Sequence, residues 1–132
     1  CYYGDINDDC MRDGYGRTEM SNGKTAYEGN YKNNKRNGFG SFYYKNGGLC
    51  YTGEWKDNKF NGQGTLIQTD GTKYKGGFVN GMEEGSGIQE DKNGNRYEGF
   101  FKQGKKHGPF VETDKNGKVI RKGTYKMGRL EN

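Results

Sequence analysis

A short phrase, tyrosine–x–glycine–x–aromatic, recurs along the 132-residue chain at nearly constant spacing. Copies of the phrase, counting a weak first copy and a degenerate last one, begin at Tyr2, Tyr27, Tyr51, Tyr74, Tyr97 and Arg121. Successive copies start 25, 24, 23, 23 and 24 residues apart. A period of this length is typical of repeat proteins, in which each unit packs only on its neighbours. Residues 1–132 are therefore predicted to form one array of repeats, the last of them incomplete.

Four units also contain a Gly-x-Gly pair, and Gly108-Pro109-Phe110 is a broken fifth copy; nine residues after the first glycine of each comes a turn glycine. The turn glycine follows Asn22, Asn46, Asp70, Asn93 or Asn116. Asn-Gly and Asp-Gly between extended segments are strong hairpin signals, because both residues tolerate positive φ. The other connection of each unit has at its tip Asn34, Asn58, Gly81, Gly104 or Gly128, which also accept the left-handed conformation. Both ends of every strand are thus expected to be turns.

The repeated phrase places its aromatic residues on one face of an extended strand and its polar residues on the other, since side chains alternate along a strand. Two such strands per unit, joined in chain order, predict an all-β fold. We expect an elongated, single-layer antiparallel meander of stacked β-hairpins, with about eleven strands and two strands per repeat.

The composition suggests how such a sheet would be held together. Only 28% of the residues are hydrophobic and 25 are glycine, which is too little apolar material for a conventional two-layer core. The aromatic residues expected to pack along the repeats are Tyr27, Tyr31, Tyr51, Trp55, Tyr74, Phe78, Tyr97, Phe101 and Tyr125. The glycines expected to provide bare backbone beneath these rings are Gly29, Gly38, Gly40, Gly53, Gly62, Gly64, Gly76, Gly85, Gly87 and Gly99. A stacking platform for bases or lipid headgroups is the less favoured interpretation of the tyrosines.

The repeats resemble MORN repeats (membrane occupation and recognition nexus). The family pattern is Tyr-Glu-Gly-x-Trp, a basic stretch, Gly-x-Gly and then Asp-Gly before the next Tyr, and residues 54–76, EWKDNKFNGQGTLIQTDGTKYKG, match it almost position for position. The similarity extends over roughly residues 2–130, with departures at Ile6, Phe110 and Arg121 in the end repeats, where capping units deviate.

The residue pattern offers no catalytic or metal-binding constellation. The one histidine, His107, lies where the repeat has a turn, so we interpret it as a turn residue. The cysteines Cys1, Cys10 and Cys50 are odd in number and lack metal-ligand spacing, and we interpret them as free thiols. We expect the chain to be no enzyme and to need no cofactor.

Charge is distributed unevenly along the chain. Residues 1–26 carry a net charge of −2, residues 27–101 of +1 and residues 102–132 of +6. The residues considered as an anion-binding or partner-binding set are Lys102, Lys105, Lys106, Arg121, Lys122, Lys126 and Arg129. These residues could bind an anionic membrane or an acidic protein, and the alternative is that they form a solvated surface without a partner. Nucleic acid and small-molecule substrates are not expected, because the rings are assigned to packing.

Two functional hypotheses follow. The first is a non-catalytic protein–protein interaction module or scaffold, which binds an extended or helical partner segment along its sheet. The resemblance implies the same, because MORN proteins are generally assembly or tethering factors of cilia, cytoskeletal collars and membrane junctions. The second, which the resemblance also suggests, is an array that binds phosphoinositide-rich or other anionic membrane and regulates an attached lipid kinase or other catalytic domain.

The expected location is the cytoplasm, within the cytoskeleton or a cilium or flagellum. The absence of a long hydrophobic run and the lysine- and asparagine-rich composition motivate this expectation. We also expect the array to be part of a larger protein or assembly, because its last unit stops in mid-hairpin and an open sheet edge is usually covered or paired.

Overall fold

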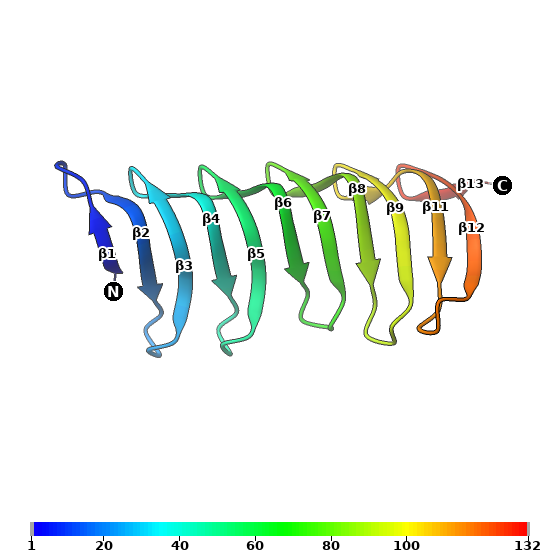
Figure 1. Cartoon of the computed structure of the whole chain (residues 1–132), viewed down its shortest axis with the longest axis horizontal. Helices are drawn as coiled ribbons and strands as arrows, with labels where there is room; N and C mark the ends of the chain where they lie inside the picture. Colours follow the sequence, from blue (N-terminus) through cyan, green and yellow to red (C-terminus); the bar gives the residue numbers. More distant parts are fainter. Residues whose placement is uncertain (1, 132) are drawn as a thin grey trace.

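The computed structural model describes residues 2–131, and in this part of the chain all regular structure is β-strand (Figure 1). The strands are β1 (Tyr2–Ile6), β2 (Arg12–Glu19), β3 (Thr25–Lys32), β4 (Lys35–Tyr43), β5 (Leu49–Lys56), β6 (Lys59–Ile67), β7 (Lys73–Val79), β8 (Met82–Glu90), β9 (Arg96–Lys102), β10 (Lys105–Lys106), β11 (Gly108–Thr113), β12 (Val119–Lys126) and β13 (Arg129–Glu131). The predicted all-β fold is confirmed.

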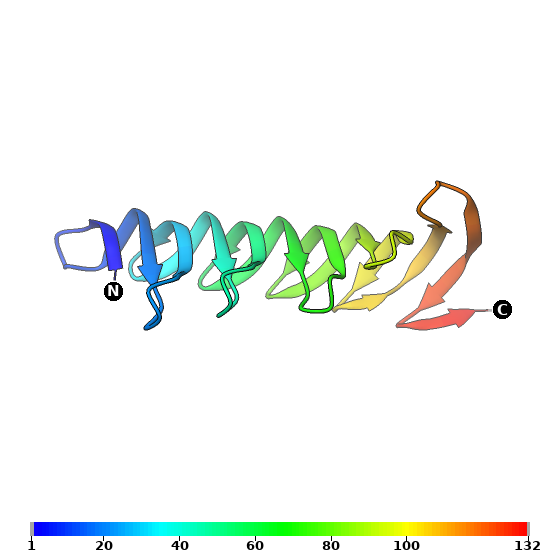
Figure 2. The same ribbon diagram turned by 90° about the horizontal axis from the view of Figure 1, so that it is seen from below.

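The strands form one open antiparallel sheet in which neighbours in the chain are neighbours in space. The order runs β1 to β9 and then β11, β12 and β13, while the two-residue β10 pairs with β9. Figure 1 shows the hairpins side by side along the long axis, with the two chain ends at opposite ends of the array. Figure 2, turned by 90°, shows that the strands are bent rather than flat. The predicted elongated single-layer meander is therefore confirmed.

The strand number differs from the expected eleven for two reasons. The chain makes a break at His107 that separates β10 from β11, and the last turn is followed by one further short strand, β13. The total of thirteen thus includes two pieces of only two and three residues.

The sheet has two kinds of turn between β2 and β13, and each kind lies along one of its two long edges. One edge has two-residue turns in which both residues have positive φ, for example Asn33 and Asn34 at 49° and 70°. This is the type I′ geometry that suits the twist of a hairpin. The residues predicted at the tips of these turns, Asn34, Asn58, Gly81, Gly104 and Gly128, all have positive φ.

The opposite edge has the longer turns predicted at Asn-Gly and Asp-Gly, and in these only the glycine adopts positive φ. Gly23, for example, has φ of 83°, whereas Asn22 is not among the residues with positive φ. Instead, the Asn22 side-chain oxygen accepts a hydrogen bond of 2.9 Å from the backbone N–H of Lys24. The asparagine therefore closes the turn through its side chain.

A row of glycines crosses the whole sheet. The central glycine of each phrase lies opposite the second glycine of the neighbouring Gly-x-Gly pairs, so that Gly40 pairs with both Gly29 and Gly53. The row continues through Gly64, Gly76, Gly87 and Gly99. A Cβ added at Gly40 would lie 2.0 Å from the hydroxyl of Tyr27, and one at Gly64 would lie 2.2 Å from that of Tyr51. The tyrosine rings therefore rest directly on these glycines.

The first glycine of each Gly-x-Gly pair does not support a ring, which corrects the expectation made for Gly38, Gly62 and Gly85. Their φ angles are 96°, 90° and 83°, in the left-handed region that glycine favours. A Cβ on Gly38 would meet the Asn30 side chain, and one on Gly85 would meet nothing within 4 Å. These glycines are needed for backbone conformation, at a point where the register of the hairpin shifts.

The buried rings lie on one side of the sheet, which we call the ring face, and form an unbroken zigzag of edge-to-face contacts. Tyr51 is 0% exposed and Trp55 is 4% exposed, with their ring centroids 5.2 Å apart. The zigzag runs through Tyr2, Tyr31, Tyr27, Trp55, Tyr51, Phe78, Tyr74, Phe101, Tyr97 and Tyr125. Each such pair contributes roughly 0.5–1.5 kcal/mol beyond the burial of its area.

The fifth unit packs its ring layer without the second glycine of the pair. Phe110 stands where the other units have the second glycine of the pair, and it is buried at 4% exposure. Its ring stacks on Tyr97 at 5.3 Å and lies 4.7 Å from Tyr125. The missing glycine is thus replaced by a ring that fills the same layer.

The buried tyrosines predict a loss of stability at alkaline pH. Burial raises the pKa of Tyr51 and of Tyr97 to about 12, and it also raises the pKa of Tyr27 and of Tyr74. The unfolded chain releases these protons near pH 10, so the folded state loses its advantage as pH rises from about 10 to 12. Urea midpoints between pH 8 and 12 should be constant up to about pH 9.5 and then fall.

A matched variant identifies the source of this pH dependence. The hydroxyl of Tyr51 donates to the carbonyl oxygen of Glu54 at 2.7 Å, and an ionised tyrosine cannot make that bond. Tyr51→Phe should therefore show a smaller alkaline decrease than the wild type. An unchanged decrease would exclude Tyr51 as a contributor.

Candidate interaction surface

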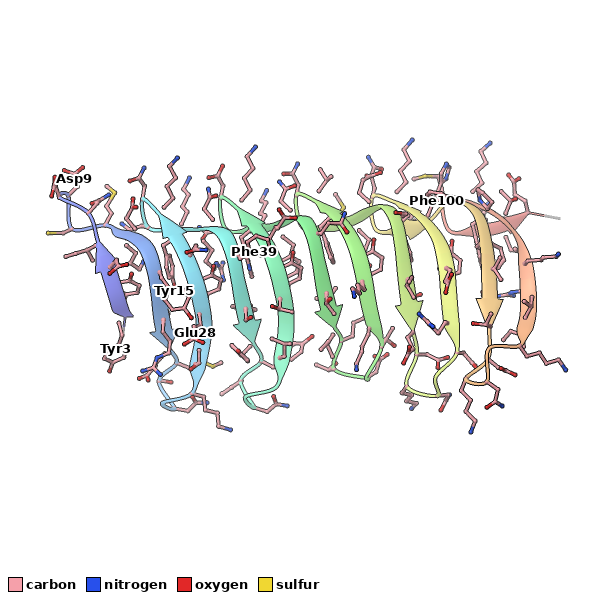
Figure 3. The ribbon with its side chains drawn as sticks, viewed as in Figure 1. Tyr3, Asp9, Tyr15, Glu28, Phe39 and Phe100 are labelled. Carbon is pink, nitrogen blue, oxygen red and sulfur yellow. The ribbon has the colours of Figure 1, made fainter. Side chains whose placement is uncertain are left out.

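The face of the sheet opposite the ring face carries large apolar side chains that the fold does not bury. Tyr15 is 58% exposed, Phe39 is 64% exposed and Phe100 is 45% exposed. The three occupy the same row, since Tyr15 and Phe39 are middle residues of Gly-x-Gly pairs and Phe100 lies opposite the middle residue Ser86. Figure 3 labels them together with Tyr3, which is 51% exposed, near the first strand. We call Tyr15, Phe39 and Phe100 the exposed aromatic row.

A shallow hollow of about 450 Å³ lies between the first two of the Gly-x-Gly aromatics. Its walls include Tyr15 and Phe39, its floor includes the backbone of Gly29, Gly40 and Gly53, and Glu28 lies at its side. No side chain from these three positions covers the floor, because their Cβ directions point to the ring face, toward Tyr27 and Tyr51. A flat or extended group can therefore approach the backbone between the two rings.

The ring face has two further hollows, but cationic side chains cover its rings. The guanidinium of Arg36 lies 4.8 Å from the Trp55 ring centroid, and that of Arg12 lies 4.8 Å from the Tyr31 centroid. The hollows, of about 290 and 230 Å³, are lined by mixed polar and aromatic residues. Burial lowers the pKa of Arg36, whose charge is stabilised by the faces of the rings beneath it.

The seven basic residues considered from the sequence do not form one patch. The ammonium group of Lys106 lies 4.6 Å from the Tyr97 ring centroid, so it packs on the ring face. Arg121 donates to Glu112 at 2.8 Å, which raises its pKa, and to the Tyr125 hydroxyl at 3.2 Å. Lys122 lies within β12. The remaining residues, Lys102, Lys105, Lys126 and Arg129, flank two-residue turns.

The histidine and the cysteines considered from the sequence do not gather into one site in the described residues. The Nδ1 atom of His107 accepts a hydrogen bond of 3.1 Å from the N–H of Met127, so the histidine supports the next turn. Cys10 is exposed with φ of 62°, Cys50 is buried, and Cys1 lies outside the described residues. Over residues 2–131 no group of three or more His, Cys, Asp or Glu side chains gathers as a metal site would require. That part of the chain also has no helix that could span a membrane.

Reasoning from the sequence missed the exposed aromatic row. The available signal was the position of Tyr15 and Phe39 between the two glycines of a pair, which strand alternation assigns to the face away from the buried rings. It also missed the residues opposite the second ring of each phrase, such as Arg36 opposite Tyr31 and Phe60 opposite Trp55. Phe60 stacks on Tyr51 at 4.0 Å.

The family model of the MORN repeat matches four consecutive segments, residues 27–49, 51–73, 74–96 and 97–119. The chain belongs to the MORN-repeat family. Each matched segment begins within the first strand of a unit, and together they cover most of the array. No curated protein matches the chain. MORN repeats occur in arrays that interact with proteins or membranes, so the family makes this chain a repeat interaction module.

Proposed function

We propose that this MORN array is a non-catalytic scaffold that binds a segment of another protein along the face opposite its buried rings. The exposed aromatic row carries this proposal. Tyr15 and Phe39 are more than half exposed, whereas the rings of the repeated phrase are buried on the other face. Exposed aromatic side chains beside a hollow are typical anchors of protein interfaces. The hollow between them has an open glycine floor that accommodates an extended or helical segment.

The structural setting proposed for this scaffold is a cytoskeletal or ciliary assembly in the cytoplasm. The elongated array supports this, since it presents repeated surface along one axis, as an assembly factor requires. The resemblance noted from the sequence also favours such a setting.

A regulatory contact with anionic membrane is the second candidate. It is supported by the net charge of +6 in residues 102–132. Against it, Lys106 and Arg121 are engaged on the ring face, by the Tyr97 ring and the Glu112 carboxylate. The scaffold function therefore accounts for more of the structure.

The scaffold function is tested by removing two anchors. Tyr15→Ser combined with Phe39→Ser should weaken binding of the partner recovered from cell extract by at least about tenfold, as expected for losing interface anchors. The matched control is Val119→Ser combined with Ile120→Ser, which replaces two exposed apolar residues in β12. Equal loss with both pairs, or no loss with either, would contradict the proposal.

A further inference from the structure

The edge of the array that holds the two-residue turns carries like-charged residues in directly opposed pairs. Lys32 lies opposite Lys35 and Lys56 opposite Lys59. Lys102 likewise faces Lys105, and Lys126 faces Arg129. All eight side chains are exposed, and none has a salt-bridge partner in the part of the chain that the structure describes. We call these eight residues the basic edge.

These pairs share the face of the exposed aromatic row. In each hairpin the first residue of the pair directly follows the last buried ring of its strand, as Lys32 follows Tyr31 and Lys56 follows Trp55. Because side chains alternate along a strand, the lysine then lies on the face opposite the rings. Figure 3 shows nitrogen-tipped side chains along the upper edge toward both ends of the array.

The middle hairpin of the five breaks the pattern with an apolar pair. Val79 lies opposite Met82, and they are 46% and 45% exposed. Along the edge, the order is therefore two basic pairs, one apolar pair and two basic pairs. Neighbouring pairs lie about 10 Å apart, because each unit adds two strands at a spacing of roughly 4.8 Å.

Like charges placed directly opposite each other on a sheet destabilise it. Four such pairs without acidic partners are therefore not explained by folding. They produce a line of positive potential that attracts a line of negative charge.

We propose that the basic edge binds an acidic segment of a partner protein, which lies across the strands with carboxylates over the lysine pairs and an apolar side chain over Val79 and Met82. This rests on the proposed scaffold function and adds the chemistry of the partner. A segment in the polyproline II conformation rises about 3.1 Å per residue and has three residues per turn, so acidic residues at every third position point to one side and match the spacing of the pairs.

The structure favours a protein segment over a bilayer. The exposed Asp57 lies in the turn between Lys56 and Lys59, and the exposed Asp8 and Asp9 form the turn between β1 and β2 on the same edge. A flat anionic bilayer that reached the lysines would meet these carboxylates too. A single segment can follow the lysine line and leave the aspartates to one side.

The test uses fluorescent peptides of about 15 residues, with glutamate at every third position and leucine at the centre. Binding to the 132-residue chain is measured by anisotropy in about 150 mM NaCl, where exposed charges beyond about 8 Å are screened. Lys56→Gln with Lys59→Gln should weaken binding about fivefold. The control, Lys45→Gln with Lys115→Gln, removes the same charge from the longer turns and should change affinity less than about twofold.

Further peptides and variants test the central apolar pair and the spacing of the acidic residues. A serine-centred peptide should bind about fivefold more weakly than the leucine-centred one, and Val79→Ser should abolish that difference. Equal binding of a scrambled peptide of the same composition would overturn the proposal. So would binding only to vesicles with about 30% phosphatidylserine, lost in the Lys56/Lys59 variant.

Failure here is distinguishable from failure of the scaffold function. If the Lys56/Lys59 variant keeps a partner whose binding depends on Tyr15 and Phe39, the scaffold function stands and the basic edge is not part of the site.

Discussion

Gly64→Ala should lower the free energy of unfolding by about 3 kcal/mol. The added methyl carbon would lie 2.2 Å from the hydroxyl oxygen of Tyr51 and 2.4 Å from its Cζ, far inside contact distance. Tyr51 cannot move aside easily, because it is fully buried and its hydroxyl donates to the carbonyl oxygen of Glu54 at 2.7 Å. Urea denaturation of the variant measures the loss.

Gly123→Ala is the matched control. Gly123 pairs with Phe110 near the end of the array, and neither Gly64 nor Gly123 has positive φ, so alanine strains neither backbone. A Cβ at Gly123 would lie 3.4 Å from the Phe110 ring, which is close to ordinary contact. The control should change stability by less than about 0.5 kcal/mol. Equal effects at both positions would mean that the glycine row does not support the rings.

Trp55→Ala should cost about 3–5 kcal/mol, the range for emptying a large aromatic site. The indole is 4% exposed and contacts the rings of Tyr27, Phe42, Tyr51 and Phe60. Its Nε1–H also donates to the carbonyl oxygen of Gly40 at 2.9 Å, and the substitution leaves that oxygen without this donor. Because the ring zigzag is continuous, hydrogen exchange should accelerate in the strands on both sides, β4 and β6.

Lys32→Ala serves as the control for Trp55→Ala. Its side chain is exposed and stands opposite another lysine, so removing it relieves repulsion and should leave the urea midpoint nearly unchanged or slightly higher. A Trp55→Ala midpoint within experimental error of the wild type would refute the role given to the ring zigzag.

The architecture was predictable because the same solution is repeated. Alternation around Tyr51 and Trp55 assigns both rings to one face, and four in-register copies leave little freedom in how strands connect. The turn conformations were only partly predictable. Asn34 adopts positive φ but Asn22 does not, because the two turns differ in length and Asn22 acts through its side chain.

The interaction surface was harder to predict because it depends on register between strands. Lys32 and Lys35 are seen to face each other only once the two-residue turn is fixed, and the exposure of Phe39 only once its strand neighbours are known. The positions of long side chains were also difficult to predict. Lys106 and Arg121 were placed in the candidate anion-binding or partner-binding set, but their aliphatic stems let them reach the ring face, where they contact Tyr97 and Glu112.

The scaffold function is tested most directly by cross-linking mass spectrometry on the native complex at physiological salt. We expect cross-links from Lys35, Lys59, Lys75 and Lys105, which lie in β4, β6, β7 and β10, to one segment of one partner protein. Lys45, Lys92 and Lys115, in the longer turns of the other edge, should give few. Cross-links spread equally over both sets, or recovery of the chain only on anionic vesicles, would contradict a partner-binding surface on the face opposite the rings.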